Sequence, residues 1–111
     1  MNEFNLSSLR REFYKGFDDR YLTTGKFNKT AMVNDLIRLI DDDFFLKAEI
    51  LKSGEKEKPF YFMKAELHLL YEINAKAGRK PYNLGFLTDW LRKQEVKISE
   101  IYQAVIEKIT R

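Results

Sequence analysis

The side chains that could support acid–base or nucleophilic chemistry are few in this chain of 111 residues. His68 is the one histidine, so a metal site with two histidine ligands is excluded within one chain. Cysteine is absent, so a thiolate nucleophile is excluded as well. His68 lies four residues from Lys64 and from Glu72, which is the spacing of one helix face. Because a general base needs a partner and a cleft, we expect His68 to be a helix-edge residue bonded to Glu72 or to water.

A run of three aspartates, Asp41–Asp43, suggests a divalent-cation site. Consecutive carboxylates on a regular element cannot all point at one ion, and no acidic residue follows at the spacing of a calcium loop. The five glycines are scattered, so no loop that cradles phosphate is present. We therefore expect a protein that is not an enzyme and that holds neither a metal ion nor a cofactor.

Basic side chains indicate a binding function instead. The chain has 20 Lys and Arg residues against 17 Asp and Glu, and its pI is near 9.1. The basic excess lies at the two ends of the chain, around an acidic middle, and such a surface either attracts phosphate or is simply a mixed solvated one. We predict phosphate contacts from the cations of the N-terminal helices and of a basic turn at 76–80, namely Arg10, Arg11, Lys15, Lys26, Lys29, Arg79 and Lys80.

Aromatic residues are more numerous than one small core would obviously hold, with nine Phe, six Tyr and one Trp. Four of them lie off or beside the main apolar stripes, namely Tyr14, Phe27, Tyr61 and Trp90. Exposed aromatic patches bind protein partners or stack on single-stranded bases. These four residues are therefore candidates for a partner-binding patch, the alternative being packing in the interior or at its rim.

In the first half of the chain, apolar residues at three- and four-residue steps predict helices over 7–22 and 29–40. Asn28 is a candidate cap of the second helix. One of the three aspartates should end that helix and cap whatever begins at Phe44. From Phe44 to Leu51 apolar and polar residues alternate, so a strand of a short hairpin and a short helix both remain open in the region 44–62.

In the second half, Pro59 and Gly78 suit the first position and the end of a helix over 59–76. Ten of the fourteen residues from 60 to 73 are apolar or aromatic, so we expect this helix to be buried on most sides. Helices over 84–94 and 99–110 follow, the last one capped by Ser99. Their spacing is that of a helix-turn-helix, but we favour a plain antiparallel helix hairpin, because short connections between packed helices are common. On the first of these two interpretations the second helix would carry Lys97, Gln103, Lys108 and Arg111.

Together these patterns predict one mainly α domain of four to five helices. It would consist of an N-terminal helix pair (1–43) and a C-terminal three-helix part (59–111). No stretch approaches the length of apolar residues that spans a membrane, and no signal peptide is visible. The absence of cysteine fits a reducing compartment, so we expect a cytoplasmic protein.

The N-terminal third shows a further pattern. Residues 3–6 (EFNL) precede a helix, and residues 25–37 (GKFNKTAMVNDLI) combine a loop glycine with a capped second helix. In this order of elements residues 3–41 resemble the ribbon-helix-helix repressors. The resemblance implies an intertwined dimer whose paired strands enter the major groove of DNA. It also implies base contacts from Glu3, Asn5 and Ser7, and a phosphate on the backbone amides of Asn28, Lys29 and Thr30. The strand is very short, however, and lacks the Arg, Lys or Gln that most base readers use.

We therefore expect a nucleic-acid-binding regulator or accessory protein, with DNA as the favoured nucleic acid and a homodimer as a further expectation. The alternative is a small helical inhibitor or adaptor that docks on a larger intracellular protein complex.

Overall fold

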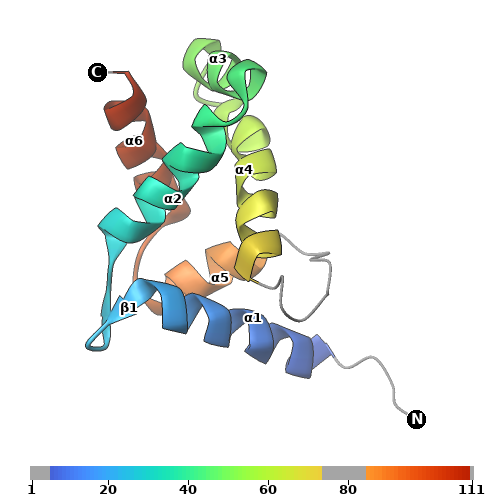
Figure 1. Cartoon of the computed structure of the whole chain (residues 1–111), viewed down its shortest axis with the longest axis vertical. Coiled ribbons are helices and arrows are strands. Elements are labelled where there is room, and N and C mark those ends of the chain that lie inside the picture. Colours follow the sequence, from blue (N-terminus) through green and yellow to red (C-terminus); the bar gives the residue numbers. More distant parts are fainter. Residues whose placement is uncertain (1–5, 74–84, 111) are drawn as a thin grey trace.

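The chain forms six helices and one short hairpin within residues 6–73 and 85–110, which are the residues that this computed structural model describes (Figure 1). The mainly α fold class is confirmed, with one helix more than the four to five predicted. In chain order the elements are α1 (Leu6–Tyr21), β1 (Leu22–Thr23), β2 (Lys26–Phe27), α2 (Lys29–Asp41), α3 (Phe44–Lys52), α4 (Lys58–Ile73), α5 (Gly85–Lys93) and α6 (Ile98–Ile109).

The additional helix is α3, in the region where a hairpin and a short helix were both open. The helix is correct and the strand is wrong. Asp43 caps α3 by accepting a hydrogen bond from the backbone N–H of Leu46 at 3.0 Å. A helix also brings Leu46 and Ile50, four residues apart, to the same buried side, whereas a strand would not select these two alone.

Side-chain capping was predicted correctly at two helices and wrongly at a third. Asn28 caps α2 by accepting from the N–H of Ala31 at 3.0 Å. Ser99, in contrast, lies inside the first turn of α6, because the helix begins one residue earlier and its N-cap position is Lys97, which makes no side-chain cap bond. The cause lies in the preceding turn, where Glu95 adopts a left-handed φ of 60° and the N–H of Val96 bonds back to the carbonyl of Leu91.

A two-residue turn links α1 to α2. Thr24 and Gly25 both have positive φ (50° and 80°), the combination that a tight hairpin turn requires. The hairpin pairs Leu22 with Phe27 and Thr23 with Lys26. It therefore holds the end of α1 beside the start of α2, and the N–H of Asn28 bonds to the carbonyl of Tyr21 at 2.7 Å.

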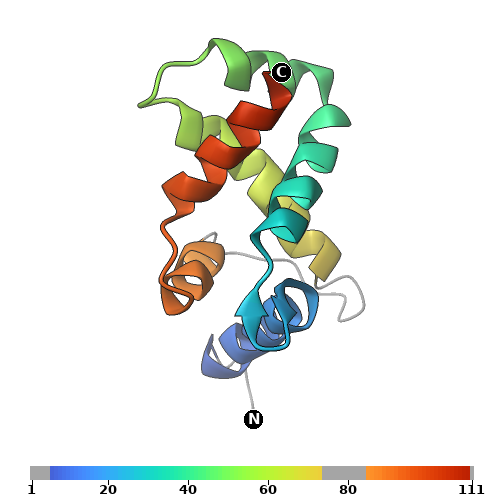
Figure 2. The ribbon, with the colours of Figure 1, turned by 90° about the vertical axis from the view of Figure 1, so that its left-hand side faces the viewer.

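The helices lie in two groups. Helices α2, α4 and α6 lie beside one another and run more along the long axis of the molecule than across it (Figures 1 and 2). Helix α2 packs on both of the others. Helices α1 and α5 pack together beneath them and run across their axes, while α3 closes the opposite end. Helix α5 therefore belongs to one group and α6 to the other. The prediction that the helices over 84–94 and 99–110 form an antiparallel hairpin is wrong, because the axes of α5 and α6 cross instead of running side by side (Figure 2).

Trp90 of α5 occupies the centre of the lower group. Its side chain is 1% exposed, and its ring centroid lies 5.5–6.2 Å from those of Phe17, Tyr21 and Phe27. The indole N–H donates to Asp18 of α1 at 2.8 Å, across 72 positions of sequence. Trp90 thus joins α1, the hairpin and α5, and the expectation that it is part of an exposed patch is wrong.

Gly16 marks a close approach between α1 and α4. A β-carbon placed there would collide with the Cγ2 methyl of Ile73. The glycine that weakens α1 as an isolated helix therefore has a packing role.

We predict that Gly16→Ala lowers the free energy of unfolding, measured by urea denaturation. The gain in helix propensity is about 1 kcal/mol, while overpacking typically costs about 1–3 kcal/mol. In an Ile73→Ala background the collision is absent, so the same change should stabilise the protein. Equal effects in the two backgrounds would contradict the close approach.

Candidate functional site

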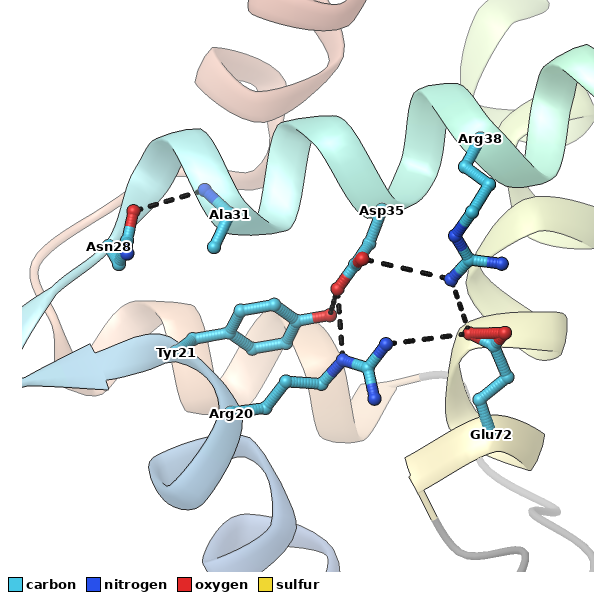
Figure 3. A network of polar contacts seen from close by, with 7 residues as sticks. All are labelled: Arg20, Tyr21, Asn28, Ala31, Asp35, Arg38 and Glu72. Atoms are coloured by element: carbon cyan, nitrogen blue, oxygen red, sulfur yellow. Dashed lines mark hydrogen bonds and ion pairs between the residues drawn. The ribbon is translucent and has the colours of Figure 1, made fainter.

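Charged side chains of α1, α2 and α4 form a connected network where these three helices meet (Figure 3). Asp35 accepts hydrogen bonds from Arg20 Nε at 2.9 Å and from the Tyr21 hydroxyl at 2.8 Å. Arg38 donates to Glu72 Oε1 at 2.7 Å and lies 3.7 Å from Asp35 Oδ1. Arg20 Nη2 lies 3.7 Å from the same glutamate oxygen. Two cations and two anions thus form one connected network around a buried tyrosine.

This network is unsuited to proton transfer near neutral pH. Burial, reinforced by the hydrogen bond to Asp35, holds the pKa of Tyr21 well above its usual range. Burial alone would raise the pKa of Asp35, but hydrogen bonds from Arg20 and Tyr21 outweigh it and hold that pKa below its ordinary value. The hydrogen bond to Glu72 raises the pKa of Arg38. Tyr21, Asp35 and Arg38 therefore each keep one protonation state, and the network acts as a clamp between three helices.

The structure describes only some of the residues that were predicted to bind nucleic acid. Arg11, Lys15, Lys26, Lys29 and Thr30 are exposed, and none of these four cations forms an ion pair within the described residues. Asn28 is half-buried, with its side chain engaged in the cap of α2. The hairpin places Lys26 close in sequence and space to Lys29 and Thr30. The side chain of Arg10, together with Asn5, Arg79 and Lys80, lies outside the described residues.

The four aromatic candidates do not form one patch. Tyr14 is half-buried under the ammonium of Lys93, 4.4 Å from its ring centroid, and Phe27 packs on the buried Trp90. Tyr61 lies apart from them on α4, half-buried beside the exposed ring of Phe60. Packing in the interior or at its rim thus accounts for all four.

The exposed apolar side chains lie elsewhere. Among the described residues, every large apolar side chain that is exposed belongs to α3 or α4, two consecutive helices that pack on each other. We call this set the α3–α4 apolar surface. It comprises Phe44 (77% exposed), Phe45 (79%), Leu51 (41%), Phe60 (68%), Met63 (43%) and Tyr71 (37%).

The sequence contained a signal for this surface. Helix α4 has two apolar stripes, and the one through Phe62, Ala65 and Leu69 is fully buried. Phe60, Met63, Leu67 and Tyr71 repeat at steps of three, four and four on another side. The expectation that this helix is buried on most sides is wrong, because no described element covers the second stripe.

Polar contacts on three sides fix the rotation of α4 about its axis. Lys64 pairs with Asp43, the cap of α3. Glu72 bonds to Arg38 of α2. On a third side Glu66 accepts from the Tyr102 hydroxyl of α6 at 2.9 Å. The stripe through Phe60 and Met63 occupies the side that these contacts leave free.

Two hollows flank the Phe60–Met63 ridge. One, of about 360 Å³, lies toward α3 and is lined by Leu46, Tyr61 and Leu67 among others. The other, of about 420 Å³, lies between α4, α5 and α6, with Glu66 and Tyr102 in its lining.

Glu66 is the one fully buried charged residue among those described, at 3% exposed. Burial raises its pKa to about 7, against which the hydrogen bond from Tyr102 works only in part. Burial likewise raises the pKa of Tyr102.

Two kinds of site are absent from the described part of the chain. No cluster of three or more potential ligands (His, Cys, Asp or Glu) is placed to hold a metal ion. None of the described helices is both long enough and apolar enough to cross a membrane.

We predict that Asp35→Ala lowers the free energy of unfolding by about 1–3 kcal/mol, because it leaves the Tyr21 hydroxyl buried without an acceptor. A folded-state pKa below the ordinary 3.8 means that Asp35 contributes stability above that pH and loses it on further acidification. The difference between the wild-type protein and the variant should therefore be constant from about pH 5 to pH 8 and shrink below about pH 4. Urea titrations across this range would measure it, and a difference that grows on acidification would refute the clamp.

Glu66→Gln should have the opposite pH dependence. The pKa of Glu66 is about 7 in the folded protein against an ordinary 4.5, so its stabilising contribution is complete below 4.5 and is lost as the pH rises to 7. The variant should therefore gain up to about 3 kcal/mol over the wild-type protein at pH 8 and gain little at pH 4.5. Thermal unfolding at both pH values would measure the gain, with Glu100→Gln, an exposed position on α6, as the control. The same gain at both pH values would contradict a buried carboxylate.

We compared the chain with family models, curated proteins and solved structures, and none of the three comparisons gives a match.

Proposed function

We propose that the chain is a non-enzymatic helical module that binds another protein through the α3–α4 apolar surface. The observation that carries this proposal is the gathering of all six exposed large apolar side chains of the described residues on two consecutive helices. Single exposed apolar residues are normal on protein surfaces, whereas six large ones on two helices that pack on each other point to a binding site. The function is that of an adaptor or inhibitor, the alternative drawn from the sequence.

The size of the surface supports a protein partner. A phenylalanine side chain offers about 200 Å², so Phe44, Phe45 and Phe60, exposed by 68–79%, present about 450 Å² of apolar area. One side of a standard protein–protein interface buries about 800 Å². Leu51, Met63 and Tyr71 extend the area further, so the surface can form the apolar centre of such an interface.

The charges around the surface favour a polypeptide over a lipid bilayer. The exposed Asp41 and Asp42 lie three and two positions before Phe44 and would repel anionic lipid headgroups. Lys47 pairs with Asp41, and Lys52 pairs with Glu49, so both signs of charge border the aromatic rings. A mixed polar rim around an apolar centre is the usual composition of a protein interface. The lack of cysteine fits a partner in the cytoplasm.

A nucleic acid is the second candidate partner, and the observation that favours it is the cationic end formed by the hairpin and α2. Lys26 and Lys29 are exposed there beside Thr30, with no ion pair to a described residue. Binding in the manner of the ribbon-helix-helix repressors would further require residues 3–5, outside the described residues, and a dimer. The other two exposed cations of the predicted set, Arg11 and Lys15, lie on α1 among the acidic residues Glu12, Asp18 and Asp19, so we rank this candidate second.

Photo-cross-linking distinguishes the two candidates. We predict that Phe60→p-benzoylphenylalanine, irradiated in an extract of the source cells, forms a protein adduct that Lys29→p-benzoylphenylalanine does not form. With the captured protein purified, Phe45→Ser and Phe60→Ser should each weaken binding at least about tenfold, as expected for central aromatic contacts. Their free energies of unfolding should change by about 0.5 kcal/mol or less, because these rings are exposed.

The control is Thr30→Ala, an exposed change at the other end of α2 that should leave the affinity unchanged. Affinity unaffected by both serine substitutions would contradict the proposal. A nucleic-acid adduct at position 29, with binding that falls steeply as salt is raised, would establish the second candidate instead. An adduct between two copies of the chain at position 60 would make the occupant a homodimer.

A further inference from the structure

The hollow between α4, α5 and α6 adjoins the α3–α4 apolar surface and differs from it in chemistry. Phe60 and Met63 contribute to both, so whatever covers the surface also reaches the hollow. Its other walls are Pro59, Thr88 of α5 and Tyr102 of α6. Within this mainly apolar lining lies one carboxyl group, that of Glu66.

The carboxyl group of Glu66 lacks hydrogen-bond donors. An ionised carboxylate can accept several hydrogen bonds, yet within the described residues Tyr102 OH is the one donor to Glu66, at 2.9 Å from Oε1. No described cation pairs with it. A buried carboxylate with a single hydrogen bond is costly, and it gains from any further donor, most of all from a charged one.

The described cations of α4 and α5, two of the three helices that line the hollow, are engaged elsewhere. On α4, Lys58 donates to the carbonyls of Ile50 and Ser53, and Lys64 pairs with Asp43. On α5, Arg92 pairs with Asp89 and Lys93 lies over the ring of Tyr14. The missing counter-ion of Glu66 is therefore not supplied by these helices.

We propose that this hollow receives a lysine or arginine side chain of the protein partner, with Glu66 as its counter-ion. This inference rests on the proposed function and specifies the chemistry of the partner. A basic side chain has an apolar stem and a cationic head, which match the Phe60 and Met63 walls and the carboxylate beyond them. The ring of Tyr102 adds an electron-rich face for the cation. A phosphate or carboxylate would be repelled by Glu66, and a neutral group would leave its charge unbalanced.

The experiment uses small probes, so it needs no protein partner. Phenethylammonium, 2-phenylethanol and 3-phenylpropionate have nearly the same shape and differ in charge. Each is titrated into the ¹⁵N-labelled full chain at about pH 8, above the pKa of about 7 of Glu66. We expect the cation to shift the amide signals of Thr88 and Tyr102 at a concentration at least about tenfold below that of the alcohol, which is the effect of one charged hydrogen bond. The anion should give no shifts.

Two variants separate the role of the charge from that of the shape. Glu66→Gln keeps the side-chain shape and should abolish the preference for the cation over the alcohol. Tyr102→Phe removes the competing donor and should preserve that preference. The control Glu107→Gln, an exposed position on α6, should bind as the wild-type chain does. Equal binding of cation and alcohol by the wild-type chain, or an unchanged preference in Glu66→Gln, would overturn the assignment of Glu66 while leaving the α3–α4 apolar surface untested by it.

A second arm identifies the source of the cation. Each Lys and Arg in the cross-linked segment of the captured partner is replaced by Ala, and affinity is measured against wild-type chain and Glu66→Gln. One replacement should weaken binding to the wild-type chain and have no effect on binding to Glu66→Gln. If no replacement shows this coupling although the probe cation binds, the hollow takes a free amine and the assignment to the partner is wrong.

Discussion

The rotation of α4 about its own axis is the constraint on which the account of this protein depends. Helix α4 carries apolar residues on most of its circumference, so hydrophobic burial alone would allow several rotations. Lys64, Glu66 and Glu72 select one of them, because each bonds to a different neighbouring helix. Rotating the helix would break these contacts, and it would also expose the apolar stripe through Phe62, Ala65 and Leu69, which the neighbouring helices bury.

This rotation has two consequences for binding. It turns Phe60 and Met63 outward, beside the exposed rings of α3, and so creates the α3–α4 apolar surface. It also turns Glu66 inward, between α5 and α6, where Tyr102 gives it one hydrogen bond. The surface and the carboxylate in the neighbouring hollow are thus products of the same packing. The network around Asp35 joins α4 to α1 and α2 and stabilises that packing.

Local signals in the sequence were sufficient for the helices and insufficient for what surrounds them. Caps and spacing predicted α1, α2, the cap Asn28 and a capping aspartate before Phe44, which is Asp43, because these depend on neighbours within a few residues. The burial of Trp90 depends on Asp18 and on rings 60 or more positions away, and no local pattern contains that information. The same holds for Phe60, since periodicity shows that α4 has a second stripe but not which stripe the other helices cover. The base contact predicted for Asn5 and the phosphate contacts predicted for Arg79 and Lys80 fall outside the described residues and stay predictions.

The rotation of α4 is tested most directly by measuring how exposed each phenylalanine ring is in the isolated chain. With all nine phenylalanines replaced by 4-fluorophenylalanine and the ¹⁹F signals assigned by single Phe→Leu variants, a dissolved paramagnetic gadolinium chelate broadens the signals of exposed rings. The account predicts strong broadening for Phe44, Phe45 and Phe60 and little for Phe17 and Phe62. Phe60 and Phe62 lie on the same turn of α4, so they form a matched pair. Protection of Phe60 in a chain shown to be monomeric, or broadening of Phe62, would contradict the rotation of α4 and with it the binding surface.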